Sequence, residues 1–218
     1  YNGASGNDTF YGEAGDDYMR GGAGVDTYFG GAGNDRISFY SATATQGVIA
    51  SLLTQTIAND GFGNAETMNS VEGLGQGTAF ADQMTGDNNA NLMLGGAGDT
   101  ILGLDGDDQF QIEGAPAVLD GGVGNDTIIG MGGQKLIPDT NGDGLAELVD
   151  QTVGVVVNLA LGQIVNDGYG GSGAFTSIEN VTGSVLGDTL TGDSAANQLG
   201  GGDGNDTLVG GGGNDRLT

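Results

Sequence analysis

The stretch GGAGVDTYFGGAGNDRIS, residues 21–38, contains one nine-residue pattern twice. Each copy opens with Gly-Gly-Ala-Gly, places an aspartate sixth (Asp26, Asp35) and an apolar residue eighth (Tyr28, Ile37). A period of nine does not fit the 3.6-residue turn of an α-helix, but it divides into a six-residue glycine turn and a three-residue strand. The stretch therefore predicts short strands joined by tight turns.

The same nine-residue frame recurs in three blocks of the chain, and its eighth position is more strictly kept than its sixth. In the middle block we place the frame at Asp82, Asn91 and Thr100, drop one residue, and resume it at Asp108. The sixth position is acidic at Asp8, Asp17, Asp26, Asp35, Asp82, Asp108, Asp126, Asp188, Asp206 and Asp215. The eighth position is apolar in every copy: Phe10, Met19, Tyr28, Ile37, Met84, Met93, Leu102, Phe110, Leu119, Ile128, Ile137, Leu190, Leu199, Leu208 and Leu217.

Two nonamers form one complete coil of 18 residues. Side chains alternate between the two faces of a strand, so the central apolar residue points inward while its neighbours point outward. Stacked coils then bury a ladder of apolar residues between two parallel sheets, with Tyr28 opposite Ile37. The predicted fold is an all-β parallel β-roll, a solenoid of 18-residue coils.

The aspartates of successive coils stack along the edges of such a roll, where strands lie about 4.8 Å apart. Carboxylates at that spacing repel each other unless a cation lies between them. Carboxylate and turn carbonyl oxygens are hard ligands in flexible loops, a combination that favours Ca²⁺ over Mg²⁺ and soft metals. The same-edge pairs are Asp8 with Asp26, Asp17 with Asp35, Asp108 with Asp126, and Asp188 with Asp206.

The composition supports a cation as partner and excludes several classes of function. The 218 residues include 48 glycines, and 29 acidic residues against four basic ones give a net charge of −25. Such a chain is unsuited to nucleic acid or an anionic membrane surface, and it has no apolar run long enough to insert into a membrane. Without cysteine or histidine it lacks disulfides, ordinary zinc sites and imidazole-dependent catalysis, so we expect no catalytic residues. We also expect this sequence to be a fragment of a longer chain.

Four nonamers, GGAGVDTYF, GGAGNDRIS, GGVGNDTII and GGDGNDTLV, closely resemble the GGxGxDxUx repeat of the RTX (repeats-in-toxin) family, a calcium-binding parallel β-roll. The resemblance implies that several Ca²⁺ ions are bound by the aspartates and by turn carbonyls, and that the module is exported by bacteria. The sequence departs from this pattern at Asn91, Asn197, Thr100, Ala117 and Lys135, where we expect no complete calcium site because the aspartate is replaced. The carbonyl ligands it implies are Gly21, Ala23, Gly31, Gly33, Gly121, Val123, Gly202 and Gly204.

Two inserts that resemble each other at an offset of about 107 residues interrupt the nonamers. NDGFG at 59–63 matches NDGYG at 166–170, and Glu72 and Glu179 occupy matching places that suggest a turn cap or calcium ligand. VIASL and VVVNL predict strands, so we expect the inserts to extend one continuous solenoid as two longer coils. The predicted divisions are a first roll block 1–38, an insert 39–76, a middle block 77–137, a second insert 138–182 and a last block 183–218.

The second insert also contains DTNGDGLAELVD, residues 139–150, with oxygen ligands at the spacing of an EF-hand loop and Gly144 at its sixth position. Ala146 at position eight and the absence of convincing flanking helices count against a complete EF-hand; a polar surface turn is the alternative. The predicted ligands are Asp139, Asn141, Asp143, Glu147 and Asp150.

Two functional hypotheses follow. The first is a calcium-binding module of a secreted bacterial protein, folding on Ca²⁺ outside the cell with a structural or adhesive role in a surface layer, matrix or filament array. The second is an accessory module of a secreted protease, lipase or alginate epimerase whose catalytic domain lies outside this chain. Exposed roll ends could pair with another copy, since solenoids need caps, but the sequence decides neither self-association nor a carbohydrate partner.

Overall fold

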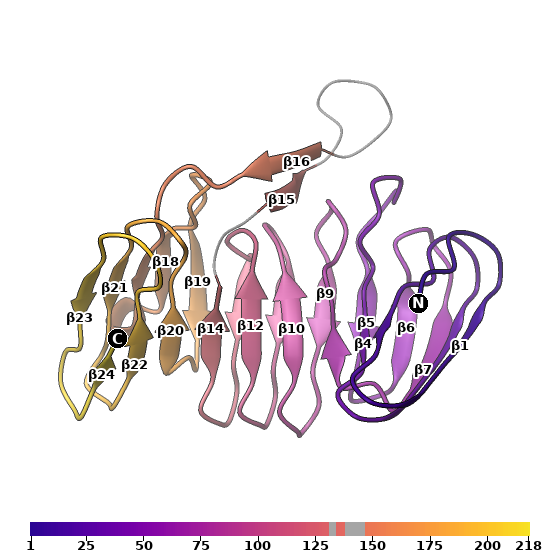
Figure 1. Ribbon diagram of the computed structural model, residues 1–218, viewed down its shortest axis with the longest axis horizontal. Helices are drawn as coiled ribbons and strands as arrows, with labels where there is room; N and C mark the ends of the chain where they lie inside the picture. The colour runs from indigo at the N-terminus through magenta and orange to yellow at the C-terminus, as the bar shows by residue number, and fades with distance from the viewer. Residues whose placement is uncertain (131–133, 138–146) are drawn as a thin grey trace.

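The computed structural model describes residues 1–130, 134–137 and 147–218, and it is built almost entirely of strands. The strands lie side by side along the long axis of the molecule, with the two chain ends at opposite ends of the stack (Figure 1). In the described part of the chain, the one helical segment is the 3-10 turn η1 (Leu159–Leu161), and no helix is long and apolar enough to cross a membrane. The predicted all-β parallel roll is confirmed.

The wider of the two main sheets has thirteen strands. In spatial order they are β1 (Thr9–Ala14), β3 (Thr27–Ala32), β7 (Glu66–Asn69), β6 (Thr56–Asn59), β5 (Ile49–Ser51), β9 (Gln83–Thr85), β11 (Thr100–Leu102), β13 (Val118–Asp120), β19 (Gly173–Thr176), β18 (Gln163–Asn166), β17 (Val156–Asn158), β21 (Thr189–Thr191) and β23 (Thr207–Val209).

The second main sheet has nine strands, all parallel to their neighbours, and a separate hairpin stands apart from both sheets. The hairpin pairs β15 (Gln134–Ile137) with β16 (Glu147–Asp150) and projects above the roll in Figure 1. The nine strands, in order, are β2 (Tyr18–Met19), β4 (Arg36–Ile37), β8 (Gly73–Leu74), β10 (Leu92–Gly95), β12 (Gln109–Ile112), β14 (Thr127–Ile129), β20 (Asn180–Thr182), β22 (Gln198–Gly200) and β24 (Arg216–Leu217).

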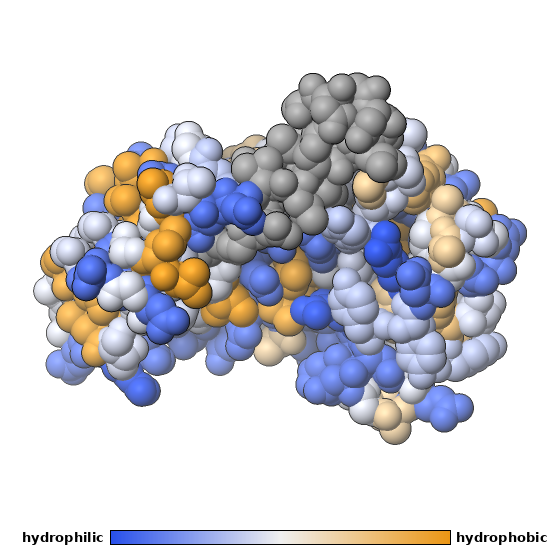
Figure 2. Space-filling model, turned by 45° about the horizontal axis from the view of Figure 1, so that its top comes forward, coloured by the Kyte–Doolittle hydropathy of each residue, from blue (hydrophilic) through white to orange (hydrophobic). Residues whose placement is uncertain are grey.

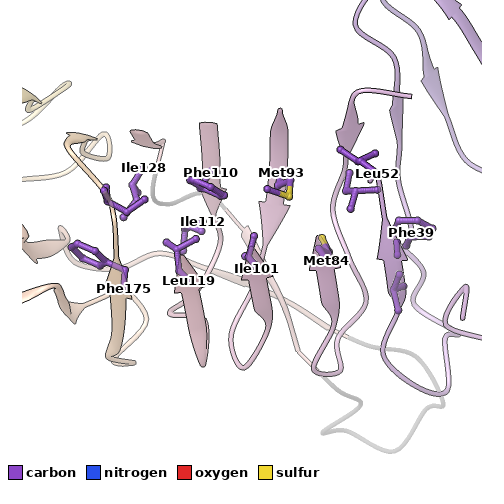
Figure 3. Packing of buried hydrophobic residues seen from close by; sticks show 14 of the residues in the cluster. Phe39, Leu52, Met84, Met93, Ile101, Phe110, Ile112, Leu119, Ile128 and Phe175 are labelled. Carbon is purple, nitrogen blue, oxygen red and sulfur yellow. The ribbon is translucent and has the colours of Figure 1, made fainter. Parts of the chain in front are cut away.

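The coil repeat sets the register of the sheets. Phe10 pairs with Tyr28 in the wider sheet and Met19 pairs with Ile37 in the narrower one, each 18 residues apart. Most of the predicted eighth-position residues fill the space between the sheets, where burial of each large apolar side chain stabilises the roll by about 2 kcal/mol. In the last coil the prediction is wrong, because Leu208 is only partly buried and Leu217 is 45 % exposed with no further coil to cover it. Figure 3 shows the two facing rows, Met84, Ile101 and Leu119 against Met93, Phe110 and Ile128.

Each insert adds three strands to the wider sheet but only one to the narrower sheet. In the first insert, β7 lies parallel to β3 and β5 lies parallel to β9, while β6 runs antiparallel between them. The second insert repeats this arrangement with β19, β18 and β17. The inserts therefore continue the sheets of the roll, as folded-back meanders rather than as simple longer coils, and they account for the unequal strand numbers.

The predicted frame is wrong in two places. Ile101, not Leu102, pairs with Met84 and is fully buried, so the missing residue lies in the turn before Asp99 and not after Thr100. The turn GGAGD, residues 95–99, is one residue shorter than its counterparts, and the strand begins correspondingly earlier. Ile137 belongs to β15, which pairs only with β16, so this last copy of the middle block does not stack in the roll.

Candidate calcium sites

The glycine turns carry an aspartate to the start of successive strands along both edges of the roll. Asp26 precedes β3 in the wider sheet and Asp35 precedes β4 in the narrower one, so neighbouring nonamers lie on opposite edges, as predicted. Both carboxylates are 1 % exposed, as deep in the structure as the apolar core. The turns therefore bury negative charge, which is costly unless that charge is hydrogen-bonded or paired with a cation.

One oxygen of each paired aspartate caps the coil before it. Asp26 Oδ1 accepts a hydrogen bond from the backbone N–H of Asp8 at 2.8 Å, and Asp35 Oδ1 accepts one from Asp17 at 2.9 Å. The same bond joins Asp108 N–H to Asp126 at 2.8 Å and Asp188 N–H to Asp206 at 3.0 Å. All four predicted same-edge pairs are thus brought together, through a carboxylate and a backbone amide; Asp215 caps Asn197 in the same way.

The second oxygen of six aspartates is buried and has no hydrogen-bond partner within the described residues. An ionised carboxylate oxygen left unpaired in the interior costs several kcal/mol, and a hard cation would offset that cost. All six hold the sixth position of the nonapeptide frame, and Asp120 Oδ1, outside that position, is the one further aspartate oxygen in this state within the described residues. The six are Oδ2 of Asp8, Asp17, Asp26, Asp35, Asp108 and Asp126.

Backbone carbonyls approach the same places as these carboxylate oxygens. A methyl group built on Gly103 would lie 2.1 Å from the Gly121 carbonyl oxygen and 2.3 Å from Asp108 Oδ2. Any side chain at this position would clash with both oxygens, so the turn requires glycine. A carbonyl oxygen from one coil and a carboxylate oxygen from the coil before it therefore approach the same point beside Gly103, and both are hard oxygen donors of the kind that Ca²⁺ prefers.

The carbonyls implied by the family resemblance lie in these turns. Besides Gly121, the Gly21 carbonyl oxygen approaches the turn one coil earlier, 2.6 Å from a methyl group built on Gly3. The Ala23 and Val123 carbonyls each accept a backbone N–H, from Gly6 and Gly106 respectively, at 2.8 and 2.9 Å. The φ angle is positive at Gly31, Gly33, Gly202 and Gly204.

Two of the predicted ligands, Asp82 and Asp188, have both oxygens hydrogen-bonded by the protein. Asp82 Oδ1 accepts from Val48 N–H and the Thr78 hydroxyl, and its Oδ2 accepts from Thr78 N–H. Asp188 has the same three bonds, from Val155 N–H and from the hydroxyl and N–H of Ser184. Both aspartates lie in the first turn after an insert.

Four acidic residues outside the predicted aspartates take part in the same edge ladders. Asp99 Oδ1 caps Asp82 N–H at 2.9 Å, and the GGAGD turn is the sequence signal that could have placed it. Glu72 and Glu179 cap Asp35 and Asp126 N–H at 2.9 and 2.8 Å, which confirms the turn-cap interpretation of this matched pair. Glu66 caps Asp26 N–H at 3.0 Å and had no counterpart in the second insert to indicate its role.

Burial raises the pKa of several of these carboxyl groups, because the charged form loses its water. Desolvation raises the pKa of Asp108 and of Asp126 to about 6, against the lowering effect of backbone N–H donors. Desolvation and the Asp82 charge raise the pKa of Asp99 to about 7. Desolvation raises the pKa of Glu66 to about 8, with added repulsion from Asp26 and Asp60. The edges therefore bind protons or cations more readily than exposed carboxylates do.

A groove lies along the narrower sheet beside Glu72 and Gly73, where the first insert enters that sheet. The groove has a volume of about 480 Å³ and is lined by Asp17, Asp35, Glu72 and Asn91, among others. Asp17 and Asp35 are among the groove residues, and the Oδ2 atom of each is buried without a hydrogen-bond partner among the described residues. On the face shown in Figure 2, hydrophilic residues predominate and hydrophobic ones form scattered patches.

The EF-hand-like loop lies mainly outside the described residues. Asp139, Asn141 and Asp143 fall there, while Glu147 and Asp150 belong to the antiparallel strand β16. Among the residues that the structure describes, no three acidic side chains cluster closely enough to hold a metal ion by themselves. Any ion at the roll edges would therefore need carbonyl or other neutral oxygens in addition to the carboxylates.

Comparison with known proteins gives one result that bears on these turns. The sequence profile of the RTX calcium-binding nonapeptide repeat matches the chain in four copies, at residues 2–37, 75–102, 118–134 and 182–217. The four matches together span more than half of the chain. No curated protein matches the sequence.

Proposed function

The chain belongs to the family of RTX calcium-binding nonapeptide repeats, and from that premise we propose that it is a module of a secreted bacterial protein that folds on calcium outside the cell. Its role there is structural or adhesive. The calcium-binding β-roll is the family property; export, folding on calcium and the structural role are the proposal. The observation that carries it is the row of six buried Oδ2 atoms with no hydrogen-bond partner among the described residues.

We assign the strongest calcium sites to the turns of these six aspartates. The assignment rests on the close approach of a carbonyl and a carboxylate oxygen beside Gly103, and on the same approach beside Gly3 and Gly12. Asp206 and Asp215 in the last coils keep the same frame and are assigned to the same type of site. Asp82 and Asp188 are assigned weaker binding, because protein donors already occupy both of their oxygens.

The net charge explains why folding would wait for calcium. At −25, self-repulsion opposes the compact state, and stacking the coils concentrates that charge along two edges. At the low Ca²⁺ concentration of a cytoplasm the chain would remain unfolded and ready for export. Extracellular Ca²⁺, binding with dissociation constants of about 10⁻⁴–10⁻³ M, would shift the equilibrium toward the folded roll by mass action.

Circular dichroism of this chain in Ca²⁺ and in EDTA at neutral pH tests the proposal. We expect strand content in millimolar Ca²⁺ and its loss in EDTA, with recovery when Ca²⁺ is restored. Mg²⁺ at the same concentration is the control, and it should restore little structure because Mg²⁺ demands a stricter geometry. Unchanged strand content in EDTA would contradict folding on calcium.

A further inference from the structure

A second groove lies on the outer face of the narrower sheet, across the strands β14, β20, β22 and β24, and has a volume of about 240 Å³. These strands lie side by side near the C-terminal end of the roll in Figure 1. The side chains of its wall alternate along each strand with the residues of the core, and the register places them in one row across the sheet. They are Thr127, Asn180, Gln198 and Arg216.

Gly200 leaves a gap between two hydroxyl groups on this face. A methyl group built on Gly200 would lie 3.5 Å from Thr218 Oγ1 and 3.6 Å from Thr182 Oγ1, which is ordinary van der Waals contact. The position therefore has room for a side chain, and it is open because the residue is glycine. A ligand group in this gap would lie beside both hydroxyls.

Hydrogen bonds within the protein hold the wall of the groove in place. Asn180 is 4 % exposed, and its Oδ1 accepts the backbone N–H of Gln198 at 2.9 Å. Its Nδ2 donates to Asn125 Oδ1 at 3.1 Å and to Thr127 Oγ1 at 3.3 Å. Gln198 and Arg216 are exposed beside this ordered amide, so the groove presents polar groups on a preformed surface.

The two grooves of the narrower sheet hold corresponding places but differ in charge. Each lies at the strand that an insert adds to this sheet, β8 in the first and β20 in the second. Among the described residues, none that lines the second groove is acidic. The second groove therefore offers no carboxylate to a cation and suits another kind of ligand than the edges of the roll do. The acids that line the first groove are Asp16, Asp17, Asp35, Glu72 and Asp107.

The arginine of the second groove also differs from its counterpart in the first. Arg216 begins β24 as Arg36 begins β4, and Asn-Asp precedes both. The guanidinium of Arg36 lies over the ring of Tyr18, 5.1 Å from its centre, and Arg36 is half-buried. Gln198 takes the place of Tyr18 beside Arg216, which is exposed. The N–H donors of Arg216 are therefore accessible to a ligand in the groove.

We propose that this groove binds a sugar residue of an uncharged polysaccharide. Its hydroxyl and amide groups both donate and accept hydrogen bonds and its guanidinium donates, which matches the neighbouring hydroxyls of a sugar. A net charge of −25 repels polyanions, and one arginine does not reverse that repulsion, so the ligand is uncharged. The proposal gives the adhesive role proposed above a ligand class, and it rests on that role only in requiring a folded roll.

Retention of the calcium-loaded chain on immobilised neutral glucans, galactans and mannans tests the groove, with hyaluronate as the acidic comparison. We expect retention on at least one neutral polysaccharide and none on hyaluronate. Circular dichroism of the same sample reports folding separately. A folded chain retained on no neutral polysaccharide would overturn the groove and leave calcium-dependent folding standing, and stronger retention on hyaluronate would overturn the choice of an uncharged ligand.

Two variants locate the binding, in calorimetric titrations with the polysaccharide that is retained. Arg216→Ala should bind about tenfold more weakly, the usual effect of losing one hydrogen bond from a charged group. Gly200→Val fills the gap between the hydroxyls with a residue that strands favour, so it should fold as wild type and lose binding. Arg36→Ala, which changes the corresponding arginine of β4, is the control and should bind as wild type. Wild-type affinity in either Arg216→Ala or Gly200→Val would overturn the site.

Discussion

Asp126 and Asp82 hold the same place in the nonapeptide frame, yet their surroundings differ. Asp126 follows the glycine turn GGVGN, caps one N–H and keeps a buried Oδ2 without a partner among the described residues. Asp82 follows GTAFA, whose Thr78 supplies a hydroxyl and an N–H to the carboxylate. A glycine turn therefore leaves one oxygen of its aspartate available to a cation, whereas a turn that contains Thr78 supplies hydrogen-bond donors to both oxygens. Ser184 donates to Asp188 in the same way as Thr78 donates to Asp82, through its N–H and its hydroxyl.

The largest loss of stability should come from removing the carboxylate of Asp126 or of Asp82. Asp126→Ala removes a proposed calcium ligand and the cap of Asp108 N–H, and Asp82→Ala leaves the N–H groups of Val48 and Thr78 unpaired in the interior. In saturating Ca²⁺ each change should lower the free energy of unfolding by about 3 kcal/mol. Only Asp126→Ala should also lower the calcium stoichiometry, as calorimetric titration would measure. An equal loss of bound calcium in Asp82→Ala would contradict the proposed difference in calcium binding between Asp126 and Asp82.

The strand content of the calcium-free protein should depend on pH. Burial raises the folded-state pKa of Asp108 and Asp126 from 3.8 to about 6 and that of Glu66 from 4.5 to about 8. A group with a raised folded-state pKa contributes stability that is complete below its unfolded pKa and is lost as pH rises through the folded value. Without calcium, strand content should therefore be greater at pH 5 than at pH 8, with the change between about pH 4 and 8.

Circular dichroism at a series of pH values in EDTA measures this effect, and the calcium-loaded protein is the control. Protons should replace calcium in neutralising the carboxylates at the roll edges, so the loaded roll should change less over the same range. Equal or greater strand content at pH 8 than at pH 5 in EDTA would show that these carboxylates do not oppose folding.

The smallest effect should come from the hydroxyls of the capped turns. Thr78→Ala and Ser184→Ala each remove one hydrogen bond to a buried carboxylate and keep the N–H bond to its other oxygen. Each should cost about 1 kcal/mol of stability and leave the calcium stoichiometry unchanged, as thermal denaturation and calorimetric titration would show. Thr176→Ala, which changes an exposed residue of β19, is the matched control. A stability loss limited to low calcium would indicate that these turns bind the ion after all.

Much of the roll could be predicted from the sequence, because each coil of a solenoid is specified by residues that are close together in the chain. The spacing of Asp26 and Asp35 places them on opposite edges, and the apolar eighth position places Tyr28 in the core, as the structure confirms. The error at Leu102 arose where one residue is missing, because two neighbouring apolar residues, Ile101 and Leu102, left the strand register open. Pairing with Met84 decides that register.

For the inserts, the strands could be predicted from the sequence but their order in the sheet could not. Alternating, β-branched segments indicated the strands at Ile49–Ser51 and Val156–Asn158, and both are present. Their order in the sheet was not predictable, because β5 pairs with a later strand and β7 with an earlier one. The proximity of Glu66 to Asp26, 40 residues earlier, follows from that order and from nothing in the nearby sequence.

The 18-residue coil, the two facing sheets, the apolar ladder and the rows of aspartates can all be read from the chain, because each depends on a short periodic pattern acting through strand alternation. The folded molecule was needed to find which carboxylate oxygens remain without a partner among the described residues, where the frame loses a residue, and which glutamates lie along the edges. Hydrogen-bond satisfaction depends on the groups that neighbouring strands bring into reach, and in this fold those strands come from distant parts of the chain.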